Sequence, residues 1–316
     1  MKFGIGFGCV VAVAAVCMPL LSPVSAHEIA GTRIVARDVA PKAAPAFPGN
    51  VGDFHGYVSH SFTVDGCNAV VVEPKVPLAG RPWLWRTMFW DAFPAVDSAM
   101  LAHGYYVAFI DVGNTYGCPD AMKHFDVFYD QLTSDYGFSK HTALEGLSRG
   151  GLYAYRWAYV NAGKVGCLYG DAPVCDMKMW PGGQGKVAKN DGEWQQALNS
   201  YHFTDQQMMD FTGNPIDILA PIAAKHVPII HVCGDSDSYV PKEVNSDIVR
   251  ERYMKLGGKF VEIVKVGCDH HPHGLADPTP VVDFILENTA GGDVAAEARK
   301  TAPKAGTVIV LPKGQW

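Results

Sequence analysis

The sequence predicts an α/β fold, with a mostly parallel central sheet, helices on both faces and an inserted cap. Three observations favour this class. Strand-like apolar runs alternate with helix-like stretches from about residue 69 onward, and such alternation implies parallel strands joined by helical crossovers. The run Tyr105–Val112 is almost continuously apolar, as expected of a strand covered on both faces. The polar motifs follow strands, at the edge where parallel sheets bind ligands.

The expected elements follow from this alternation in chain order. Apolar runs predict strands at 69–73, 82–89, 105–112, 141–147, 165–171, 227–233 and 260–266. Helix-like stretches between them predict helices at 95–103, 120–136, 152–161, 242–256 and 280–288. The helix at 242–256 carries its charges on one face, which indicates a surface helix.

Four segments do not follow this alternation of strands and helices. Residues 1–26 are expected to be a signal peptide, because Lys2 precedes an apolar run that ends in the small residues Val24-Ser25-Ala26. Residues 27–50 are rich in Ala and Pro and are interpreted as an extended leader before the main domain at 51–290. The long aromatic-rich insertion at about 172–226 is interpreted as the cap. Residues 291–316 form a C-terminal tail that is either loose or adds a further strand.

Composition limits the compartment and the partners. The net charge of −6, without a basic block, does not favour nucleic acid or an anionic membrane surface. The signal peptide predicts an exported protein, periplasmic or secreted, that leaves the membrane after cleavage. Export permits disulfides, but the sequence does not decide whether the remaining cysteines pair or stay as free core thiols: Cys67, Cys118, Cys167, Cys175, Cys233 and Cys268. It does not indicate the oligomeric state.

The segment Gly146–Gly151 fits G-x-S-x-G and lies between a predicted strand and a predicted helix. A sharp strand-to-helix turn exposes the serine, and the helix start offers free N–H groups, so Ser148 is the candidate nucleophile. Such a serine needs a base and an acid that orients the base, in the chain order nucleophile, acid, base. The strand at 227–233 ends in a loop with Asp235 and Asp237. Asp237 is the preferred acid, and Asp235 and Asp171 are alternatives.

The following strand ends in a histidine-rich loop. His270 comes first after the strand and is the candidate base, with His271 and His273 as alternatives. The histidines that are not the base are expected to contact substrate or to brace the loop. The sequence has no G-x-G-x-x-G, no phosphate loop and no metal-ligand cluster, so we expect neither a cofactor nor a metal.

An oxyanion formed on attack needs two hydrogen-bond donors. The backbone N–H of Arg149 is the first candidate, and the stretch Trp90–Phe93, after the predicted strand at 82–89, supplies the second. Trp180 is a candidate for stacking on a sugar, and Arg86 or Lys186 for binding a substrate carboxylate. Each of these side chains has a structural alternative: for Arg149 this is a salt bridge that fixes the helix.

With these motifs, the sequence resembles the α/β-hydrolase superfamily over about residues 60–290. The resemblance lies in the motif at 146–150, the aspartate loop at 234–241 and the His270 loop. The segments 81–86, 171–176 and 270–273 are similar to those of exported bacterial hydrolases associated with polysaccharide breakdown. The Ser148-Arg149 pair also resembles the elbow of glucuronoyl esterases, which implies a guanidinium that assists the oxyanion. This chain continues with Gly150-Gly151, where those enzymes have a different pair.

Together these features predict a serine carboxylesterase that acts through an acyl-enzyme, with a small-molecule or polysaccharide ester as substrate. A peptidase or amidase with the same machinery is the second hypothesis. The third is a non-catalytic binding protein, which the strained serine turn disfavours.

Overall fold

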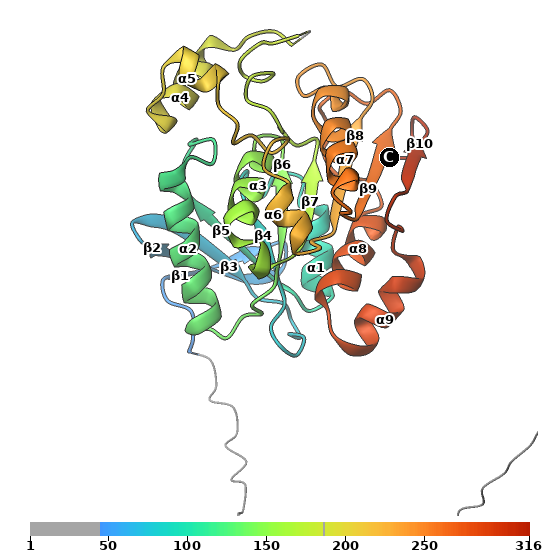
Figure 1. The fold of residues 1–316 in the computed structure, drawn as a ribbon. Helices are drawn as coiled ribbons and strands as arrows, with labels where there is room; N and C mark the ends of the chain where they lie inside the picture. The colour runs from blue at the N-terminus through green and yellow to red at the C-terminus, as the bar shows by residue number, and fades with distance from the viewer. Residues whose placement is uncertain (1–44, 186) are drawn as a thin grey trace, which may run out of the picture. The chain divides into compact units, whose positions relative to one another are not determined.

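The computed structural model describes residues 45–185 and 187–316 (Figure 1). The expected signal peptide, the leader up to residue 44 and Lys186 lie outside the described residues. No helix in the described ranges is long and apolar enough to cross a membrane.

The described residues form one ten-stranded sheet in the order β1-β2-β3-β5-β4-β6-β7-β8-β9-β10. Neighbouring strands from β5 to β10 run parallel, and β1, β2 and β3 form an antiparallel edge next to β5. The strands are β1 (Asn50–Phe54), β2 (Tyr57–Val64), β3 (Cys67–Val72), β4 (Trp83–Arg86), β5 (Tyr106–Asp111), β6 (Thr142–Leu147), β7 (Val165–Asp171), β8 (Ile229–Gly234), β9 (Phe260–Lys265) and β10 (Val308–Leu311). This mostly parallel sheet confirms the predicted fold class.

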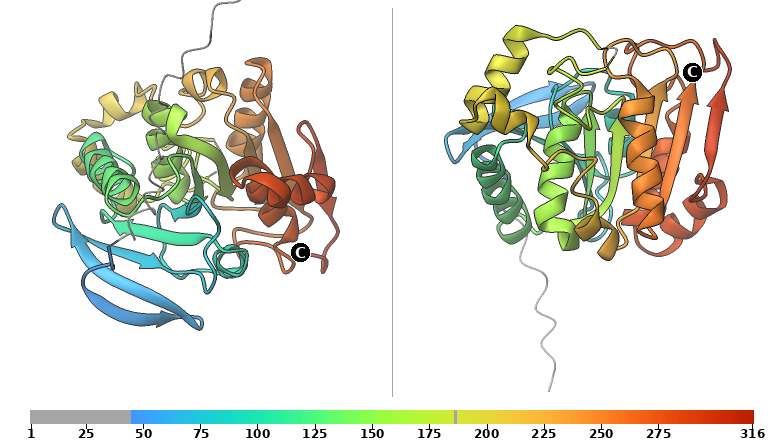
Figure 2. Two further views of the ribbon diagram at one scale, coloured as in Figure 1. Left: turned by 90° about the horizontal axis from the view of Figure 1, so that it is seen from below. Right: turned by 45° about the horizontal axis from the view of Figure 1, so that its top comes forward.

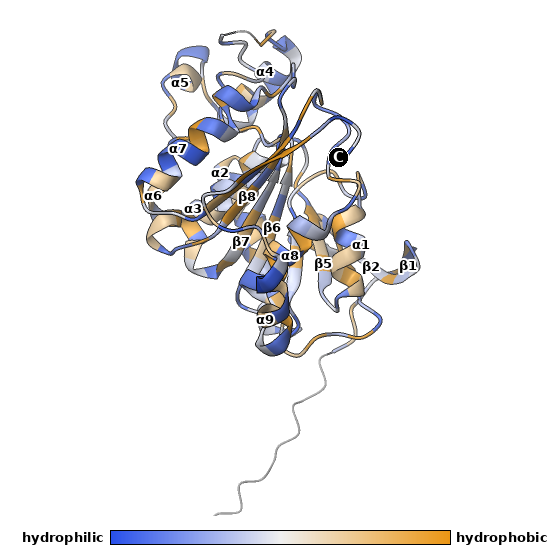
Figure 3. Ribbon diagram, turned by 90° about the vertical axis from the view of Figure 1, so that its right-hand side faces the viewer, coloured by the Kyte–Doolittle hydropathy of each residue, from blue (hydrophilic) through white to orange (hydrophobic). Residues whose placement is uncertain are grey.

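Helices cover both faces of the sheet (Figure 2). One hydrophobic cluster joins the sheet to α2 (Pro119–Ser134), α3 (Gly150–Asn161), α6 (Ala220–Ala224) and α7 (Ser246–Lys255). The other joins it to α1 (Ala95–Ala102), α8 (Thr279–Thr289) and α9 (Gly292–Thr301). Figure 3 shows hydrophobic residues along the central strands, where the two clusters meet the sheet. Burial on both faces explains why these strands are mostly apolar and do not alternate between apolar and polar residues.

The insertion at 172–226 contains α4 (Asp191–Tyr201) and α5 (Asp205–Met209), as well as α6 on the face of the sheet. Figure 1 shows α4 and α5 in yellow, apart from the helices that flank the sheet. A capping box at Thr204 and Gln207 starts α5, and the Asn190 side chain caps α4. Trp194 anchors the insertion to the first cluster.

Two parts of the sheet were not among the predicted strands. The hairpin β1–β2 was missed because most side chains of β1 are exposed and the hydrophobic signal is weak there. The C-terminal segment continues the fold beyond residue 290, since α9 packs on α8 and β10 pairs in parallel with β9. Of the two alternatives for this segment, the structure shows the further strand.

Candidate active site

The chain turns sharply at Ser148, between the end of β6 and the start of α3. Ser148 has a φ of +48°, in the left-handed region that non-glycine residues rarely adopt. Its N–H donates to the carbonyl of Asp171 at 2.8 Å, and its own carbonyl accepts from the N–H of Val174 at 2.8 Å. These bonds hold the turn, so that the serine hydroxyl stands at the carboxyl end of the sheet.

The positions of Gly146 and Gly151 beside Ser148 leave no room for a side chain. A Cβ on Gly146 would lie 2.9 Å from the backbone of Gly150 and Gly151. A Cβ on Gly151 would lie 2.6 Å from the Pro173 side chain. The backbone of the turn is therefore packed against β6 and the chain after β7 more closely than any side chain permits.

Ser148, His270 and Asp237 form a continuous hydrogen-bonded chain. The Ser148 hydroxyl lies 2.9 Å from Nε2 of His270, and Nδ1 of His270 lies 2.7 Å from Oδ2 of Asp237. The other carboxylate oxygen of Asp237 accepts the N–H groups of Tyr239 and Val240 at 2.9 and 2.7 Å. With Nδ1 as the donor to Asp237, Nε2 is free to accept the serine proton, as general-base chemistry needs.

The alternative acid Asp235 lies elsewhere. Its Oδ1 accepts the backbone N–H of Gly267 at 2.6 Å, so it ties the turn after β8 to the turn after β9. Asp269 has a similar bracing role, because its Oδ1 accepts the N–H groups of Ser238 and His270. Both carboxylates fix the two loops that carry Asp237 and His270.

Asp171 and His273 form a second carboxylate–imidazole pair beside the first. Nδ1 of His273 lies 2.6 Å from one oxygen of Asp171, and the other oxygen accepts the N–H of Gly274 at 2.7 Å and the hydroxyl of Tyr169. Burial alone would raise the pKa of Asp171, but the hydrogen bond and charge of His273, with Lys265 nearby, lower it to about 2. Asp171 is thus paired with His273, not with His270.

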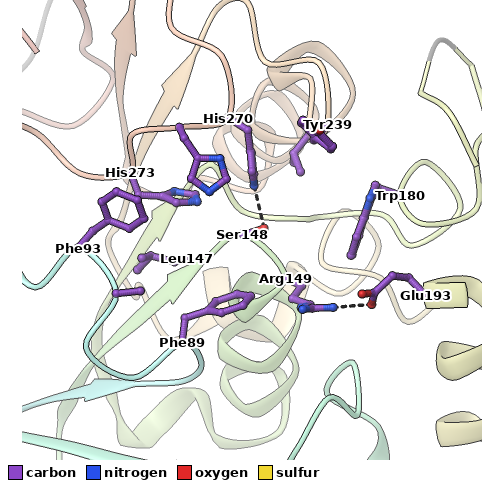
Figure 4. Close-up of a pocket in the computed structure, with 13 residues that line it drawn as sticks. Phe89, Phe93, Leu147, Ser148, Arg149, Trp180, Glu193, Tyr239, His270 and His273 are labelled. Carbon is purple, nitrogen blue, oxygen red and sulfur yellow. Dashed lines mark hydrogen bonds and ion pairs between the residues drawn. The ribbon is translucent and has the colours of Figure 1, made fainter. Parts of the chain in front are cut away.

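A pocket of about 290 Å³ opens at Ser148. Its two sides differ in chemistry (Figure 4): His273 and Phe93 lie on one side of Ser148, and Arg149, Trp180 and Glu193 on the other. The lining residues are Phe89, Ala92, Phe93, Leu147, Ser148, Arg149, Trp180, Glu193, Tyr239, Val240, His270, His271 and His273.

His271 lines the pocket with its ring edge-on to those of His270 and His273, at centroid distances of 5.0 Å. Burial and the two neighbouring imidazoles lower the pKa of His271. Trp180 also lines the pocket, so both predicted substrate contacts lie where a substrate would reach them.

Arg149 forms an ion pair with Glu193, and its guanidinium lies over the rings of Phe89 and Trp180, 5.2 and 5.8 Å from their centroids. Glu193 also accepts hydrogen bonds from Tyr116 and Asn114. Burial would raise the pKa of Glu193, but these hydrogen bonds and Arg149 lower it. The pair joins the nucleophile turn to α4, which is the predicted structural alternative, and it does so while lining the pocket.

One predicted substrate contact is wrong, that of Arg86, and the side chain of Trp90 does not line the pocket although its backbone belongs to the predicted donor stretch. Arg86 is fully buried and bonds to Asp97, Glu145 and two backbone carbonyls, because β4 is a central strand with both faces covered. The Trp90 indole is directed away from the pocket and packs against Phe54 and Phe109, with ring centroids 4.9 and 5.5 Å away. Trp83 and Trp85 are buried in the sheet core.

The backbone can still supply both oxyanion donors. Among the described residues, the N–H of Arg149 has no hydrogen-bond partner, and neither do those of Phe89, Trp90 and Phe93 in the loop after β4. Since Phe89, Ala92 and Phe93 line the pocket, this loop adjoins Ser148. The predicted donors therefore lie at the correct edge of the sheet.

Several pocket residues were not predicted. The side chains of Glu193, Phe89, Phe93 and Tyr239 enter from three separate segments, and no individual role was predicted for them. Three of them lie in segments that pointed toward the site: Glu193 in the insertion, Phe93 in the donor stretch and Tyr239 in the aspartate loop. In the described part of the chain, no group of His, Cys, Asp and Glu is arranged to hold a metal ion.

Comparison with known proteins finds structures of similar fold but no match by sequence. No family model matches the chain, and no curated protein matches it in sequence. A puromycin-hydrolyzing peptidase from Mycobacterium tuberculosis is similar in structure, with a TM-score of 0.57 and 13% identity, over 81% of this chain and 41% of that one. For dipeptidyl peptidase 4 from Porphyromonas gingivalis the values are 0.51 and 13%, over 68% and 32%.

An S-formylglutathione hydrolase from Staphylococcus aureus is similar over 68% of this chain and 92% of its own length, with a TM-score of 0.51 and 13% identity. The chain thus spans less than half of the two peptidases and matches the hydrolase over almost its full length. These likenesses, together with the sheet order, define the α/β-hydrolase fold.

Proposed function

We propose that this protein is a serine hydrolase that cleaves carboxylic esters through an acyl-enzyme. The observation that carries the proposal is the hydrogen-bonded chain from Ser148 through His270 to Asp237 at the mouth of the pocket. His270 takes the serine proton as Ser148 attacks the acyl carbon, and it returns the proton to the leaving alcohol. Water, activated by His270, then attacks the acyl-enzyme in the same way and releases the acid. Asp237, hydrogen-bonded to Nδ1 of His270, stabilises the imidazolium that forms in each half-reaction.

The first test is labelling with a fluorophosphonate probe, followed by hydrolysis of p-nitrophenyl acetate. We expect Ser148→Ala to abolish labelling and to lower kcat by about 10⁴–10⁶-fold, since no other group replaces the nucleophile. Ser200→Ala, on α4 away from the pocket, is the matched control and should keep both. Absence of labelling in folded wild-type protein would favour the binding-protein hypothesis.

The same machinery serves a peptidase, and several structures of similar fold are peptidases. A comparison of kcat/KM on p-nitrophenyl acetate and on a peptide anilide separates the two activities. An ester hydrolase prefers the first substrate. A clear preference for the anilide would assign the site to peptide bonds and leave the roles of Ser148 and His270 unchanged.

We propose an ester-bearing polysaccharide or related glycan as the substrate class, met outside the cytoplasm after removal of the signal segment. The support is Trp180 at the pocket, whose ring offers a surface for a sugar, and Arg149, whose guanidinium offers charge-assisted hydrogen bonds. Release assays on acetylated, feruloylated and methyl-esterified polysaccharides, with Ser148→Ala as the control, test this class. Release from none of them would remove the glycan proposal and leave the esterase intact.

A further inference from the structure

The guanidinium of Arg86 contacts the carboxyl groups of Asp97 and Glu145 and the backbone of the loop 87–93. Arg86, Asp97 and Glu145 are all buried, with side-chain exposures of at most 2%. Nε of Arg86 lies 3.3 Å from Asp97, and Nη2 lies 3.3 Å from Glu145. One cation therefore faces two acidic groups in the interior, and such burial is costly unless opposite charge and hydrogen bonds compensate it.

The shortest hydrogen bonds of Arg86 go to the loop and not to the acids. Nη1 and Nη2 donate to the carbonyl of Ala92 at 2.8 and 2.7 Å, and Nη1 also donates to the carbonyl of Phe89 at 3.1 Å. Each is shorter than either contact with a carboxylate. The acids thus orient the fork of the guanidinium, and the fork holds two carbonyls of the loop.

The loop needs such support because its backbone is strained. Phe89, Asp91 and Phe93 have φ values of +56°, +63° and +53°, and none of them is glycine. Residues in this region persist only where their surroundings impose the conformation. Apart from the carbonyls that Arg86 binds, the loop has one internal backbone hydrogen bond in the described structure, from Ala92 to Phe89.

The direction of the carbonyls sets the direction of the donors. In a trans peptide the C=O and the following N–H point in opposite directions. When Arg86 holds the carbonyls of Phe89 and Ala92, the N–H groups of Trp90 and Phe93 are turned away from it. These two N–H groups have no partner among the described residues, and Phe93 lines the pocket.

The start of the loop is fixed to the nucleophile turn itself. The Thr87 hydroxyl lies 2.9 Å from the carbonyls of both Glu145 and Gly150, on either side of Ser148. Thr87 therefore sets the distance from the loop to the serine, and Arg86 sets the conformation of the loop beyond it.

We propose that Arg86 is a positioning residue, which holds the loop 87–93 in the conformation that presents its backbone N–H groups to the oxyanion. It does not touch substrate. The proposal rests on the proposed serine hydrolase function and adds the group that preorganises the second oxyanion donor. It also accounts for a buried arginine at the catalytic end of a central strand.

The test compares Arg86→Met and Arg86→Lys with wild type on p-nitrophenyl acetate. Rates are normalised to the number of serines that a fluorophosphonate labels at the end-point. We expect Arg86→Met to lower kcat per labelled serine by about 10²–10³-fold, the cost of a lost oxyanion donor, with KM within about 3-fold. Arg86→Lys keeps the charge but places its N–H donors on one nitrogen instead of a planar fork, so its kcat should lie between the two.

A trifluoromethyl ketone provides a second readout, because its adduct with Ser148 carries the oxyanion. Its affinity should weaken in parallel with kcat in Arg86→Met. The matched control is Arg81→Met: Arg81 lies before the opposite end of β4 and bonds to the carbonyl of Tyr136 and the hydroxyl of Tyr106. This control should lose stability but keep kcat per labelled serine.

An Arg86→Met protein with wild-type kcat and ketone affinity, or an equal loss in Arg81→Met, overturns the proposal while the hydrolase function stands. If Arg86→Met does not fold, Arg86→Lys decides, and wild-type kcat in that variant counts against positioning. Wild-type protein that neither labels nor turns over the ester overturns the function and this inference together.

Discussion

At the scale of single residues, the site depends on carboxylates that are buried yet fully hydrogen-bonded. Asp171 accepts from an imidazole, a backbone N–H and a phenol, so its charge is tolerated at 1% exposure. Asp237 is satisfied in the same way by His270 and two backbone N–H groups. Neighbouring strand ends thus carry two His–Asp pairs, of which only one reaches Ser148.

Asp171→Asn is expected to change how stability depends on pH. The pKa of Asp171 falls from 3.8 to about 2 on folding, so the ionised form contributes stability above pH 4 that is lost as the pH falls toward 2. The difference in unfolding free energy between wild type and Asp171→Asn should shrink by about 2 kcal/mol over that range.

Urea unfolding from pH 5 to pH 2 measures this difference. The control is Asp293→Asn, at an exposed position at the start of α9, whose difference from wild type should change by less than about 1 kcal/mol. A gap for Asp171→Asn that stays constant with pH would contradict the argument.

At the scale of elements, the strand-to-helix unit β6–α3 is built around backbone contacts. Gly146 is the last-but-one residue of β6 and faces the first turn of α3. The same strand carries Glu145, whose side chain reaches Arg86 of β4. The strand that leads into the strained turn at Ser148 is therefore also tied to β4, through Glu145 and Arg86.

Gly146→Ala is expected to cost about 1–3 kcal/mol and to lower kcat, because its Cβ would displace the turn that holds Ser148. Chemical denaturation and ester hydrolysis measure the two effects. Gly163→Ala is the control, since a Cβ at Gly163 meets no atom within 4 Å. Equal stability of both variants would show that the turn accommodates a side chain.

Glu145→Gln is expected to become more stable than wild type as the pH rises. Burial, together with Asp97 and Asp171, raises the pKa of Glu145 to about 8 despite Arg86. The folded state then keeps a proton that the unfolded chain releases near pH 4.5, so wild type loses stability between about pH 5 and pH 8. The glutamine has no proton to lose.

The unfolding free energy of Glu145→Gln relative to wild type should rise by an amount on the order of 2–4 kcal/mol over that range. Urea unfolding at pH 5, 7 and 9 measures this difference. Glu297→Gln, exposed on α9, is the control and should follow wild type. Parallel curves for wild type and Glu145→Gln would mean that Glu145 is ionised in the folded protein.

At the scale of the whole molecule, the sheet extends from an exposed antiparallel hairpin to a C-terminal strand. Ile309, Leu311 and Trp316 pack against the second hydrophobic cluster, and β10 covers the outer edge of β9. The six cysteines of the described residues are free thiols in the structure, five of them buried. The fold therefore relies on packing and not on cross-links.

Removal of residues 305–316 is expected to destabilise the protein by about 3 kcal/mol, because three partly buried side chains and the β9–β10 pairing are lost. Thermal and urea unfolding measure the change. A chain that ends at Pro312 keeps β10 and should lose clearly less. Equal stability of the shorter chain and wild type would show that the strand adds nothing to the fold.

The sequence by itself predicted the parallel strands β4 to β9 and the helices between most of them in order, since each of these elements carries its own periodicity. Its motifs pointed to Ser148, Asp237 and His270, whose side chains are hydrogen-bonded in the structure. It failed for Arg86, whose side chain is buried in the core. Nor did it reveal that the indole of Trp90 packs against Phe54 and Phe109 while the backbone of its loop lies beside the site. It also did not reveal the pairing of Asp171 with His273 or of Arg149 with Glu193.

Only the tertiary structure decided those four outcomes. Each depends on which strands are neighbours and on which side chains the covering helices leave exposed, and the partners are 44 to 102 residues apart in the two pairs. A local pattern reports the conformation of its own segment, whereas a contact at the edge of a sheet requires several segments to be packed together.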